Sequence, residues 1–317
     1  MRIVFMGTPE FAVPILDILI KHRYQVVGVI TAPDKPSGRG LKMHQSAVKE
    51  YAVQHGLKIL QPEKLKNPTF IEELSALKAD LQIVVAFRML PEIVWNMPVL
   101  GTINLHASLL PQYRGAAPIN YAIINGEKTT GVTTFFLTHE IDTGNIILQQ
   151  ACSIGENETA GELHDRLMHL GAETVLKTVQ LIERKEAQVI PQQSMVHGEL
   201  KAAHKIFKDD CSIHWKNEAL TLHNFIRGLS PFPTAFTTLN TNEGESILFK
   251  IYKAAYELKI HQQEAGTVDT DGKNYLKVAC INGYINLLEV QLAGKKAMSI
   301  VEFLRGFDAG RIKMMGI

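Results

Sequence analysis

Near-continuous apolar runs that alternate with helical patterns constrain the fold of this chain more than any other feature. The clearest runs are RIVFMG (2–7), QVVGVIT (25–31), LQIVVAF (81–87) and GTINLH (101–106). Helical patterns occupy 46–55, 68–77 and 117–124. A strand that is apolar along its whole length is buried on both faces, as in parallel sheets covered by helices. The pattern therefore predicts an α/β domain with a mostly parallel, Rossmann-like sheet.

The first turn of this predicted sheet differs from a dinucleotide-binding turn. The segment GTPEFA (7–12) lacks the G-x-G-x-x-G spacing, so we expect no bound dinucleotide. Thr8 is placed to cap the following helix, with Pro9 at its first position. Further along, TGVTTFFL (130–137) and NIILQQA (145–151) read as a hairpin. A long helix is predicted over 160–185, and Thr159 with Glu162 forms a capping-box pattern at its start.

The pattern changes near residue 190, and a chain of 317 residues is long enough for a second domain. A polar stretch without strong periodicity (191–206) reads as a linker, and a helix is predicted over 218–228. Short strand-like runs follow at 235–239, 247–252, 275–280 and 284–290. Short strands separated by turn signals predict a small β-barrel. We therefore expect domains at 1–190 and 207–317.

Composition excludes several classes of protein. Cys152, Cys211 and Cys280 are odd in number and form no C-x-x-C pair, so neither a disulfide framework nor a zinc knuckle is expected. The apolar run after Arg2 is too short for a secretory signal, and no run is long enough to span a bilayer. We expect a cytoplasmic protein. The net charge of +1 neither requires nor excludes a nucleic-acid partner.

Two polar side chains stand at the end of the fourth apolar run. Asn104 and His106 are two residues apart, so a strand places both on one face. In an open parallel sheet, ligands bind beyond the carboxyl ends of the strands. Asn offers an amide donor, and His exchanges a proton near neutral pH. The alternative is that both are hydrogen-bonded polar groups at a strand end.

Asp142, in HEIDTGNII (139–147), supplies a third candidate group between two predicted strands. It can be read as an ordinary Asp-initiated turn. Near a histidine it would instead orient the imidazole and accept a proton. Asn, His and Asp together suit the attack of a neutral amine on a carbonyl carbon. The chain has no G-x-S-x-G, H-E-x-x-H or Walker A motif, which argues against hydrolase and NTPase functions.

The combination of Asn104-x-His106-x-Ser108-Leu-Leu-Pro111 with Asp142-Thr-Gly144 resembles the folate-dependent formyltransferases. Within them, the chain is similar to the methionyl-tRNA formyltransferase family along nearly its whole length. The matching segments are FMGTPEFA (5–12), PDKPSGRG (33–40), SLLPQYRGAAPI (108–119), LSPFPTAF (229–236) and LAGKKAM (292–298). The resemblance implies a Rossmann-like catalytic domain and a C-terminal, tRNA-binding OB-type barrel. It also implies formyl transfer from 10-formyltetrahydrofolate to the α-amine of initiator methionyl-tRNA, without a metal. We expect the protein to be a monomer.

Site residues follow from the same resemblance. The catalytic set is Asn104, His106 and Asp142. The folate-binding set is Arg88, Met89, Leu90, Ser108, Leu109, Leu110 and Pro111. The set that binds the methionyl group or the tRNA is Phe11, Lys35, Arg39, Lys42, Arg114 and Gly115. The loop that carries Lys35, Arg39 and Lys42 also contains two Pro and two Gly, so it suits phosphate contacts on its own chemistry.

Two features depart from the family pattern. The segment AFRMLP (86–91) is one residue shorter than the family's AYGxILP and carries Arg88, which puts the folate contacts there in question. From Lys205 onward there are 14 Lys and Arg against 12 Asp and Glu, so the net charge is only +2. That is a weak basic footprint for a nucleic-acid-binding domain.

Two other functions remain open from the sequence. One is a formyltransferase of the same chemistry that acts on a small amine such as an amino sugar. The second domain and the basic loop argue against it. The other is a non-catalytic nucleic-acid-binding protein built on the barrel. The complete Asn-His-Asp set argues against that, because a binding protein does not require it.

Overall fold

The structure is a computed structural model that describes residues 1–37, 42–196 and 198–316. The chain forms two compact units, which we call the N-terminal and C-terminal units. The N-terminal unit comprises Met1–Gly115, Thr130–Cys152 and His164–Ala202, and the C-terminal unit comprises Ala116–Thr129, Ser153–Leu163 and Ala203–Ile317. A single cut in the chain does not reproduce this division. The domain boundaries expected from the sequence (1–190, 191–206 and 207–317) stay predictions.

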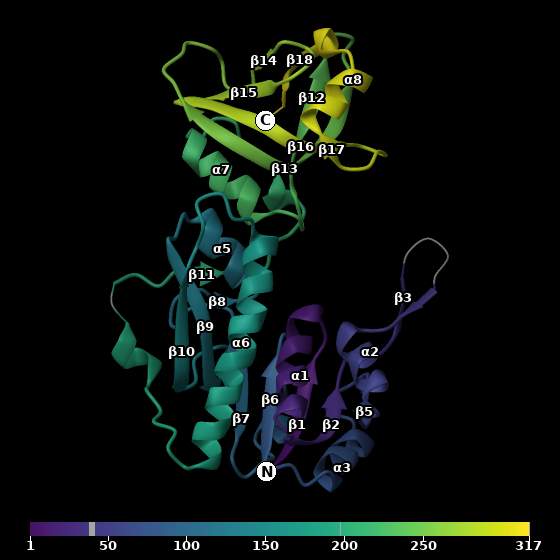
Figure 1. Ribbon diagram of the computed structural model, residues 1–317, viewed down its shortest axis with the longest axis vertical. Helices are drawn as coiled ribbons and strands as arrows, with labels where there is room; N and C mark the ends of the chain where they lie inside the picture. Colours follow the sequence, from purple (N-terminus) through teal and green to yellow (C-terminus); the bar gives the residue numbers. More distant parts are fainter. Residues whose placement is uncertain (38–41, 197, 317) are drawn as a thin grey trace. The chain divides into compact units, whose positions relative to one another are not determined.

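A seven-stranded sheet in the order β10-β9-β7-β6-β1-β2-β5 forms the centre of the N-terminal unit (Figure 1). Its strands are β1 (Arg2–Gly7), β2 (Gln25–Ile30), β5 (Ile59–Leu60), β6 (Leu81–Val85), β7 (Thr102–His106), β9 (Thr129–Phe136) and β10 (Ile146–Ser153). The pairs from β5 to β7 are parallel, and β7 pairs with β9 antiparallel. The mostly parallel sheet predicted from the apolar runs is confirmed.

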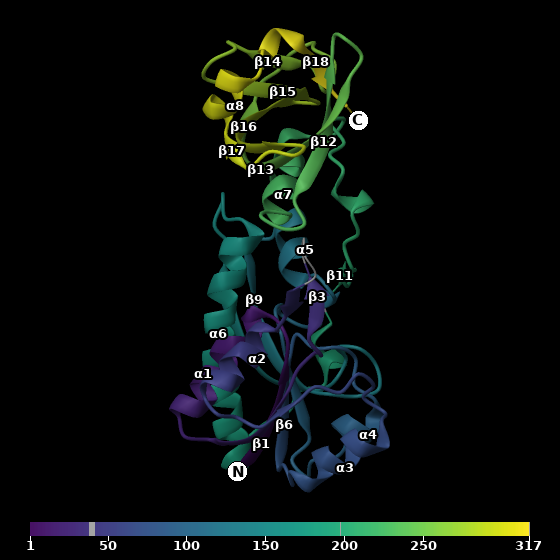
Figure 2. The ribbon, with the colours of Figure 1, turned by 90° about the vertical axis from the view of Figure 1, so that its right-hand side faces the viewer.

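Helices cover both faces of this sheet, as Figure 2 shows for α1 and α6 on one side and α3 and α4 on the other. Their bounds are α1 (Val13–Lys21), α2 (Ala47–Gln54), α3 (Pro68–Ala76), α4 (Glu92–Trp95) and α6 (Ala160–Glu183). Val4 and Val84 from the sheet pack with Phe70 of α3 on one face. On the other face, a Cβ on Gly171 of α6 would lie 2.6 Å from Leu105. The glycine therefore lets α6 pack directly on β7.

The connections create a switch point between β1 and β6. The chain runs from β1 outward through β2 to β5, and then returns to the other side of β1 to form β6 and β7. Gly7 and Val85, at the carboxyl ends of β1 and β6, are paired in register. Open α/β sheets bind ligands beyond such a point. The segments that follow β1, β6 and β7 therefore leave the sheet at this edge.

The predicted cap at Thr8 is wrong. The turn after β1 forms a 3-10 helix (Glu10–Ala12) whose N-cap is Pro9, and no side chain caps it. The α-helix begins only at Val13, with Pro14 in its first turn. Proline suits that position because the amide hydrogens of a first turn have no intrahelical acceptor. The sequence pattern identified a helix start but placed it too early.

The C-terminal unit contains a nearly closed antiparallel barrel. Its main strands follow the order β14-β15-β16-β13-β12-β18. They are β12 (Ala235–Thr241), β13 (Ser246–Leu258), β14 (Val268–Thr270), β15 (Leu276–Cys280), β16 (Gly283–Leu292) and β18 (Ile312–Met315), and β17 (Met298–Ser299) pairs with β16. The amide of Met315 donates to the carbonyl of Gly266 at 2.8 Å and brings β18 beside the segment before β14. The predicted barrel fold is confirmed.

Three helices accompany the barrel: α5 (Pro118–Ile124), α7 (Ala219–Gly228) and α8 (Ile300–Gly306). Trp215, Phe249 and Phe303 are among the buried residues of its core.

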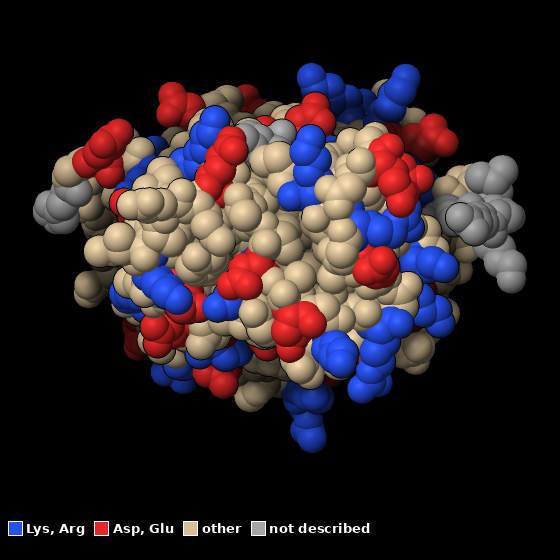
Figure 3. Space-filling model, turned by 90° about the horizontal axis from the view of Figure 1, so that it is seen from above, with Lys and Arg blue, Asp and Glu red and all other residues tan. Residues whose placement is uncertain are grey.

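Basic and acidic side chains are interspersed over the face seen in Figure 3, in keeping with a net charge of only +2 from Lys205 onward. Across the described residues, no helix is long and apolar enough to cross a membrane.

Candidate active site

The carboxyl end of β7 places Asn104 and His106 on the face that lies opposite α6. Asn104 pairs in register with Val84 of β6, and His106 pairs with Thr133 of β9. Leu105, between them, faces α6. Successive side chains of a strand alternate between faces, so the predicted pairing of Asn104 and His106 on one face is confirmed. His106 is only 7% exposed, although imidazole is a polar group.

Both ring nitrogens of His106 have a defined neighbour. Nε2 lies 2.8 Å from the carbonyl oxygen of Tyr113, and Nδ1 lies 3.8 Å from Oδ2 of Asp142. A carbonyl oxygen can only accept, so Nε2 carries a hydrogen and donates it to Tyr113. Nδ1 carries a second hydrogen only in the protonated ring. The main chain of Tyr113 therefore orients the ring, and Asp142 lies beside Nδ1 without a direct hydrogen bond.

Asp142 lies in the loop between β9 and β10 and has a left-handed backbone conformation, with φ of 55°. Its Oδ2 accepts a hydrogen bond of 3.0 Å from the amide of Gly115. Asp is one of the few residues besides glycine that adopt this conformation at modest cost. At Gly144, two residues later, a Cβ would lie 1.7 Å from the carbonyl oxygen of Phe136. The Asp-Thr-Gly sequence therefore has a physical basis in the shape of this loop.

The amide oxygen of Asn104 is buried and has no hydrogen-bond partner among the described residues. Buried side-chain oxygens almost always accept a hydrogen bond, because leaving one unpaired costs roughly 1–3 kcal/mol. Asn104 is held on a central strand and is only partly exposed, so its side chain is not free to turn into bulk solvent. An unpaired amide oxygen in such a position is a suitable acceptor for an N–H group of a substrate.

Gln192 is a site residue that the sequence did not reveal. The sequence of this stretch predicts a linker, yet the structure contains a 3-10 helix over Gln192–Met195, and Gln192 is 0% exposed. Its side chain contacts both the Asp142 loop and Arg114. Tyr113 was missed as well. It acts through its carbonyl oxygen, which every residue type has, so no sequence signal could have identified it.

The predicted folate wall at 86–91 is only partly available to a ligand. The guanidinium of Arg88 donates to the backbone carbonyls of Pro62 and Glu63, the latter at 2.8 Å, so it fixes the 62–63 segment. Met89 is 73% exposed, whereas Leu90 packs in the core below. The Arg88 guanidinium is therefore engaged within the protein, whereas the Met89 side chain is accessible to a ligand.

The segment from Ser108 to Pro111 is mostly used within the protein. The hydroxyl of Ser108 donates to the carbonyl of Gln112 at 2.7 Å. The side chain of Leu110 packs in a core cluster, its amide donates to Thr133, and its carbonyl accepts from Gln149. Leu109 is partly exposed. Folate contacts from this segment stay predictions, and Leu109 is better placed for one than Leu110.

The structure also locates most of the residues predicted to bind the methionyl group or the tRNA. Phe11 is buried and meets the ring of His164 edge-on at 5.2 Å. Arg114 is bound to Gln192, and the amide of Gly115 serves Asp142. Lys35 is the first residue of β3 (Lys35–Ser37), and the backbone of Lys42 belongs to β4 (Lys42–His44). The two strands pair antiparallel. Arg39 lies outside the described residues.

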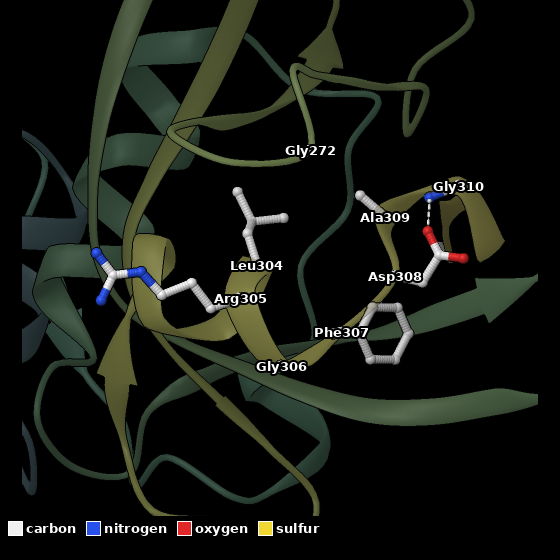
Figure 4. A pocket seen from close by; sticks show the side chains of 8 residues that line it. All are labelled: Gly272, Leu304, Arg305, Gly306, Phe307, Asp308, Ala309 and Gly310. Carbon is white, nitrogen blue, oxygen red and sulfur yellow. Dashed lines mark hydrogen bonds between the residues drawn. The ribbon is translucent and has the colours of Figure 1, made fainter.

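Neither a metal cluster nor a hollow elsewhere in the described residues competes with this strand end as the active site. Within the described ranges, no cluster of three or more His, Cys, Asp or Glu side chains could hold a metal ion. A hollow of about 420 Å³ in the C-terminal unit is lined by residues 304–310 and Gly272 (Figure 4). Its acidic side chain, Asp308, already accepts from the amide of Gly310 at 2.9 Å. This hollow contains none of the predicted site residues, so the strand end at β7 is the candidate active site.

Comparison with known proteins identifies close relatives. Residues 1–179 match the family described as formyl transferase, and residues 205–308 match its C-terminal domain. A methionyl-tRNA formyltransferase of Bacteroides fragilis is 55% identical over 97% of this chain and 95% of its own length. The Flavobacterium johnsoniae protein of the same name is 54% identical over 96% of each chain.

Among solved structures, the fold resembles an N-formyltransferase from Helicobacter canadensis in complex with folinic acid and dTDP-3-aminofucose. That likeness has a TM-score of 0.64 and covers 90% of this chain and 98% of the other, with 21% sequence identity. At this identity the likeness establishes the fold alone.

Proposed function

The chain belongs to the methionyl-tRNA formyltransferase family, and we propose that Asn104, His106 and Asp142 carry out its reaction. The enzyme transfers the formyl group of 10-formyltetrahydrofolate to the α-amine of methionyl-initiator tRNA. This reaction prepares the tRNA for translation initiation. The observation that supports the residue assignment is the meeting of His106 and Asp142, at 3.8 Å, at the end of the strand that also carries Asn104, whose amide oxygen is buried and unpaired.

The folate supplies the formyl group. The residues of this chain stabilise the negative charge that develops on the formyl oxygen and accept the proton that the amine loses. The α-amine bonds to the formyl carbon as its proton goes to Asp142, and the formyl oxygen gains negative charge along the way. The bond from that carbon to the folate nitrogen then breaks, and this nitrogen takes up a proton so that it leaves as a neutral amine. Asn104 donates from its amide NH₂ to that oxygen. The Nε2–H of His106 donates a hydrogen bond to the carbonyl oxygen of Tyr113. The hydrogen on Nδ1 of the protonated ring is therefore the one that can donate to the formyl oxygen. One such donor typically contributes roughly 3 kcal/mol.

Asp142 takes the proton that the amine loses. Its Oδ2 lies near Nδ1 of His106, and the same oxygen accepts a hydrogen bond from the amide of Gly115. A positioned base of this kind typically contributes on the order of 10²–10⁴ in rate. The unpaired oxygen of Asn104 fits the same substrate, because an amine N–H can donate to it. We assign the folate to the edge of the sheet next to Met89 and Leu109.

We infer specificity for methionyl-tRNA over a small amine from sequence identity to known enzymes. The presence of a second domain does not separate the two, because the amino-sugar formyltransferase from Helicobacter canadensis covers 90% of this chain. Sequence identity does separate them, at 55% for the Bacteroides fragilis tRNA enzyme against 21% for the sugar enzyme. We assign Phe11 to the methionyl side chain, and Lys35, Arg39, Lys42 and Arg114 to the acceptor end of the tRNA.

One assay tests this function. The purified protein is incubated with 10-formyltetrahydrofolate and either methionyl-initiator tRNA or dTDP-3-aminofucose, and the formylated products are identified by mass spectrometry. We expect N-formylmethionine on the tRNA and no formylated sugar, with the product lost in Asn104→Ala. Formylation of the sugar but not of the tRNA would refute the assignment. Because charged tRNA is a cytoplasmic substrate, we place the reaction there, and we expect a monomer in analytical ultracentrifugation.

A further inference from the structure

We propose that Gln192 is a positioning residue that holds the Asp142 loop in its catalytic conformation. The proposal rests on the function assigned above and extends it to a residue outside the Asn-His-Asp set. Gln192 lies about fifty residues from Asp142 in the chain, in a segment whose sequence has no helical or strand period. It is fully buried, and its amide makes hydrogen bonds at both ends.

The amide nitrogen of Gln192 binds the main chain of the catalytic loop. Nε2 donates to the carbonyl of Asp142 at 2.9 Å and to the carbonyl of Gly144 at 2.8 Å. Both hydrogens of the NH₂ group are therefore used on the two residues that flank Thr143. The left-handed backbone of Asp142 is a conformation that surrounding contacts must maintain. Gln192 supplies two of those contacts from one side chain.

The amide oxygen of Gln192 binds the other segment of the site. Oε1 accepts from Nε of Arg114 at 3.0 Å and from Nη2 at 2.6 Å. The next residue, Gly115, donates its amide to Oδ2 of Asp142. Gln192 thus joins two segments that also meet at the Asp142 carboxylate. A shift of either segment would change the distance between that carboxylate and Nδ1 of His106.

The chain around Gln192 is itself anchored to the sheet. Ile190 exchanges two backbone hydrogen bonds of 2.8 Å with Ile146, the first residue of β10. Pro191 is the N-cap of the 3-10 helix that begins at Gln192, and the Gln192 side chain is buried. Because Ile146 lies just after the catalytic loop, this pairing sets Gln192 at a fixed place relative to Asp142 and Gly144. A mobile linker could not hold a side chain in this way.

Only a side chain with a donor group and an acceptor oxygen at this reach satisfies both segments. Glutamate would keep an acceptor for Arg114 but would place a carboxylate oxygen against two carbonyl oxygens. Methionine would fill the same space without either bond. The two variants therefore separate the half of Gln192 that holds Asp142 from the half that holds Arg114. Gln193, the exposed neighbour in the same 3-10 helix, provides the matched control.

The test compares Gln192→Met, Gln192→Glu and Gln193→Met with the wild-type enzyme in the tRNA formylation assay. For both Gln192 variants we expect kcat to fall roughly ten- to a hundred-fold, because small displacements of a catalytic group have effects of that size. We expect KM for 10-formyltetrahydrofolate to stay within about two-fold, since positioning affects the reaction step rather than ground-state binding. Gln193→Met should behave as wild type.

Folate-binding stoichiometry, measured by calorimetry, distinguishes positioning from loss of folded protein. A positioning role lowers kcat while nearly every chain still binds one folate. A purely structural role lowers stoichiometry and kcat in parallel, and that result would overturn the proposal, as would unfolding of both variants. Wild-type kcat in Gln192→Glu would also overturn it, because that variant lacks the donors to Asp142 and Gly144. Failure of the wild-type enzyme to formylate the tRNA would instead refute the assigned function.

Discussion

The charge of Asp142 and its unusual backbone conformation are separate contributions to the site, and a substitution should remove one without the other. Asparagine also tolerates the left-handed region, and its side-chain oxygen can still accept from the amide of Gly115. Alanine would remove the charge, the hydrogen bond and the tolerance for positive φ together. Asp142→Asn therefore isolates the role of the carboxylate as a base, which alanine cannot do.

For Asp142→Asn we expect kcat to fall by a factor on the order of 10²–10⁴, the usual contribution of a positioned base. The thermal unfolding midpoint should stay within a few degrees of wild type, because the loop keeps its contacts. Glu140→Gln is the matched control, since it makes the same change of charge at an exposed position of the same loop. Steady-state formylation rates for both variants decide the point. A Glu140→Gln defect of equal size would mean that net charge, rather than the position of Asp142, is responsible.

At the scale of elements, sequence pattern predicts what is long and regular. The runs at 2–7, 25–31 and 101–106 correspond to β1, β2 and β7 within a residue or two. Most of their apolar side chains are buried, so the pattern of apolar residues is enough to define them. The sequence pattern does not predict the two- to four-residue strands β3, β4, β5, β8 (Arg114–Gly115), β11 (Ala202–Ala203), β14, β17 and β18. Pieces this short have no period to detect, and their conformation comes from the strands beside them.

In the candidate site too, the sequence predicts only the residues that have a local pattern. Asn104 and His106 were identified because polar residues are unexpected at the end of an apolar strand. Asp142 was identified through its motif. Gln192 has neither signal: its neighbours are polar, and its burial depends on a backbone pairing of Ile190 with Ile146 across more than forty residues. Contacts of that kind follow from the folded sheet and have no local pattern in the chain.

The helix α7 carries a buried histidine whose titration should affect stability. Burial lowers the pKa of His223, and the nearby Arg227 lowers it further, while Glu156 opposes the shift. Neither ring nitrogen has a hydrogen bond of normal geometry among the described residues, although the backbones of Glu156 and Ala254 lie near. The folded protein therefore favours the neutral ring more than the unfolded chain does. Stability gained this way is complete above the ordinary histidine pKa of about 6.5 and declines as pH falls below it.

We expect the urea midpoint of the wild type to fall between pH 8 and pH 5.5, and His223→Gln to lose part of that dependence because glutamine does not titrate. Tryptophan fluorescence follows the transition, since Trp215 lies in the same core. His214→Gln, at an exposed position in the same unit, should keep the wild-type pH dependence. Equal pH dependence in wild type and His223→Gln would show that other groups account for the effect.

At the scale of the whole molecule, charge is nearly balanced, with +1 over the chain and +2 from Lys205 onward. With so small a net charge, we expect individual cations rather than the overall charge to contact the tRNA phosphates. Lys35, Arg39 and Lys42, together with Arg114, are the cations assigned to this role. Each phosphate contact releases counterions, so a few contacts give a modest but measurable dependence on salt. The number of contacts can therefore be counted by titration.

We expect log(kcat/KM) for methionyl-tRNA to fall linearly with log of the KCl concentration, while KM for 10-formyltetrahydrofolate changes little. Arg39→Ala should weaken use of the tRNA and reduce the magnitude of the slope by about one, the change expected when one phosphate contact is lost. Lys273→Ala, an exposed cation of the C-terminal unit outside the assigned set, serves as the control with an unchanged slope. An Arg39→Ala enzyme with the wild-type slope would remove Arg39 from the tRNA site, and a flat slope in the wild type would remove phosphate contacts altogether.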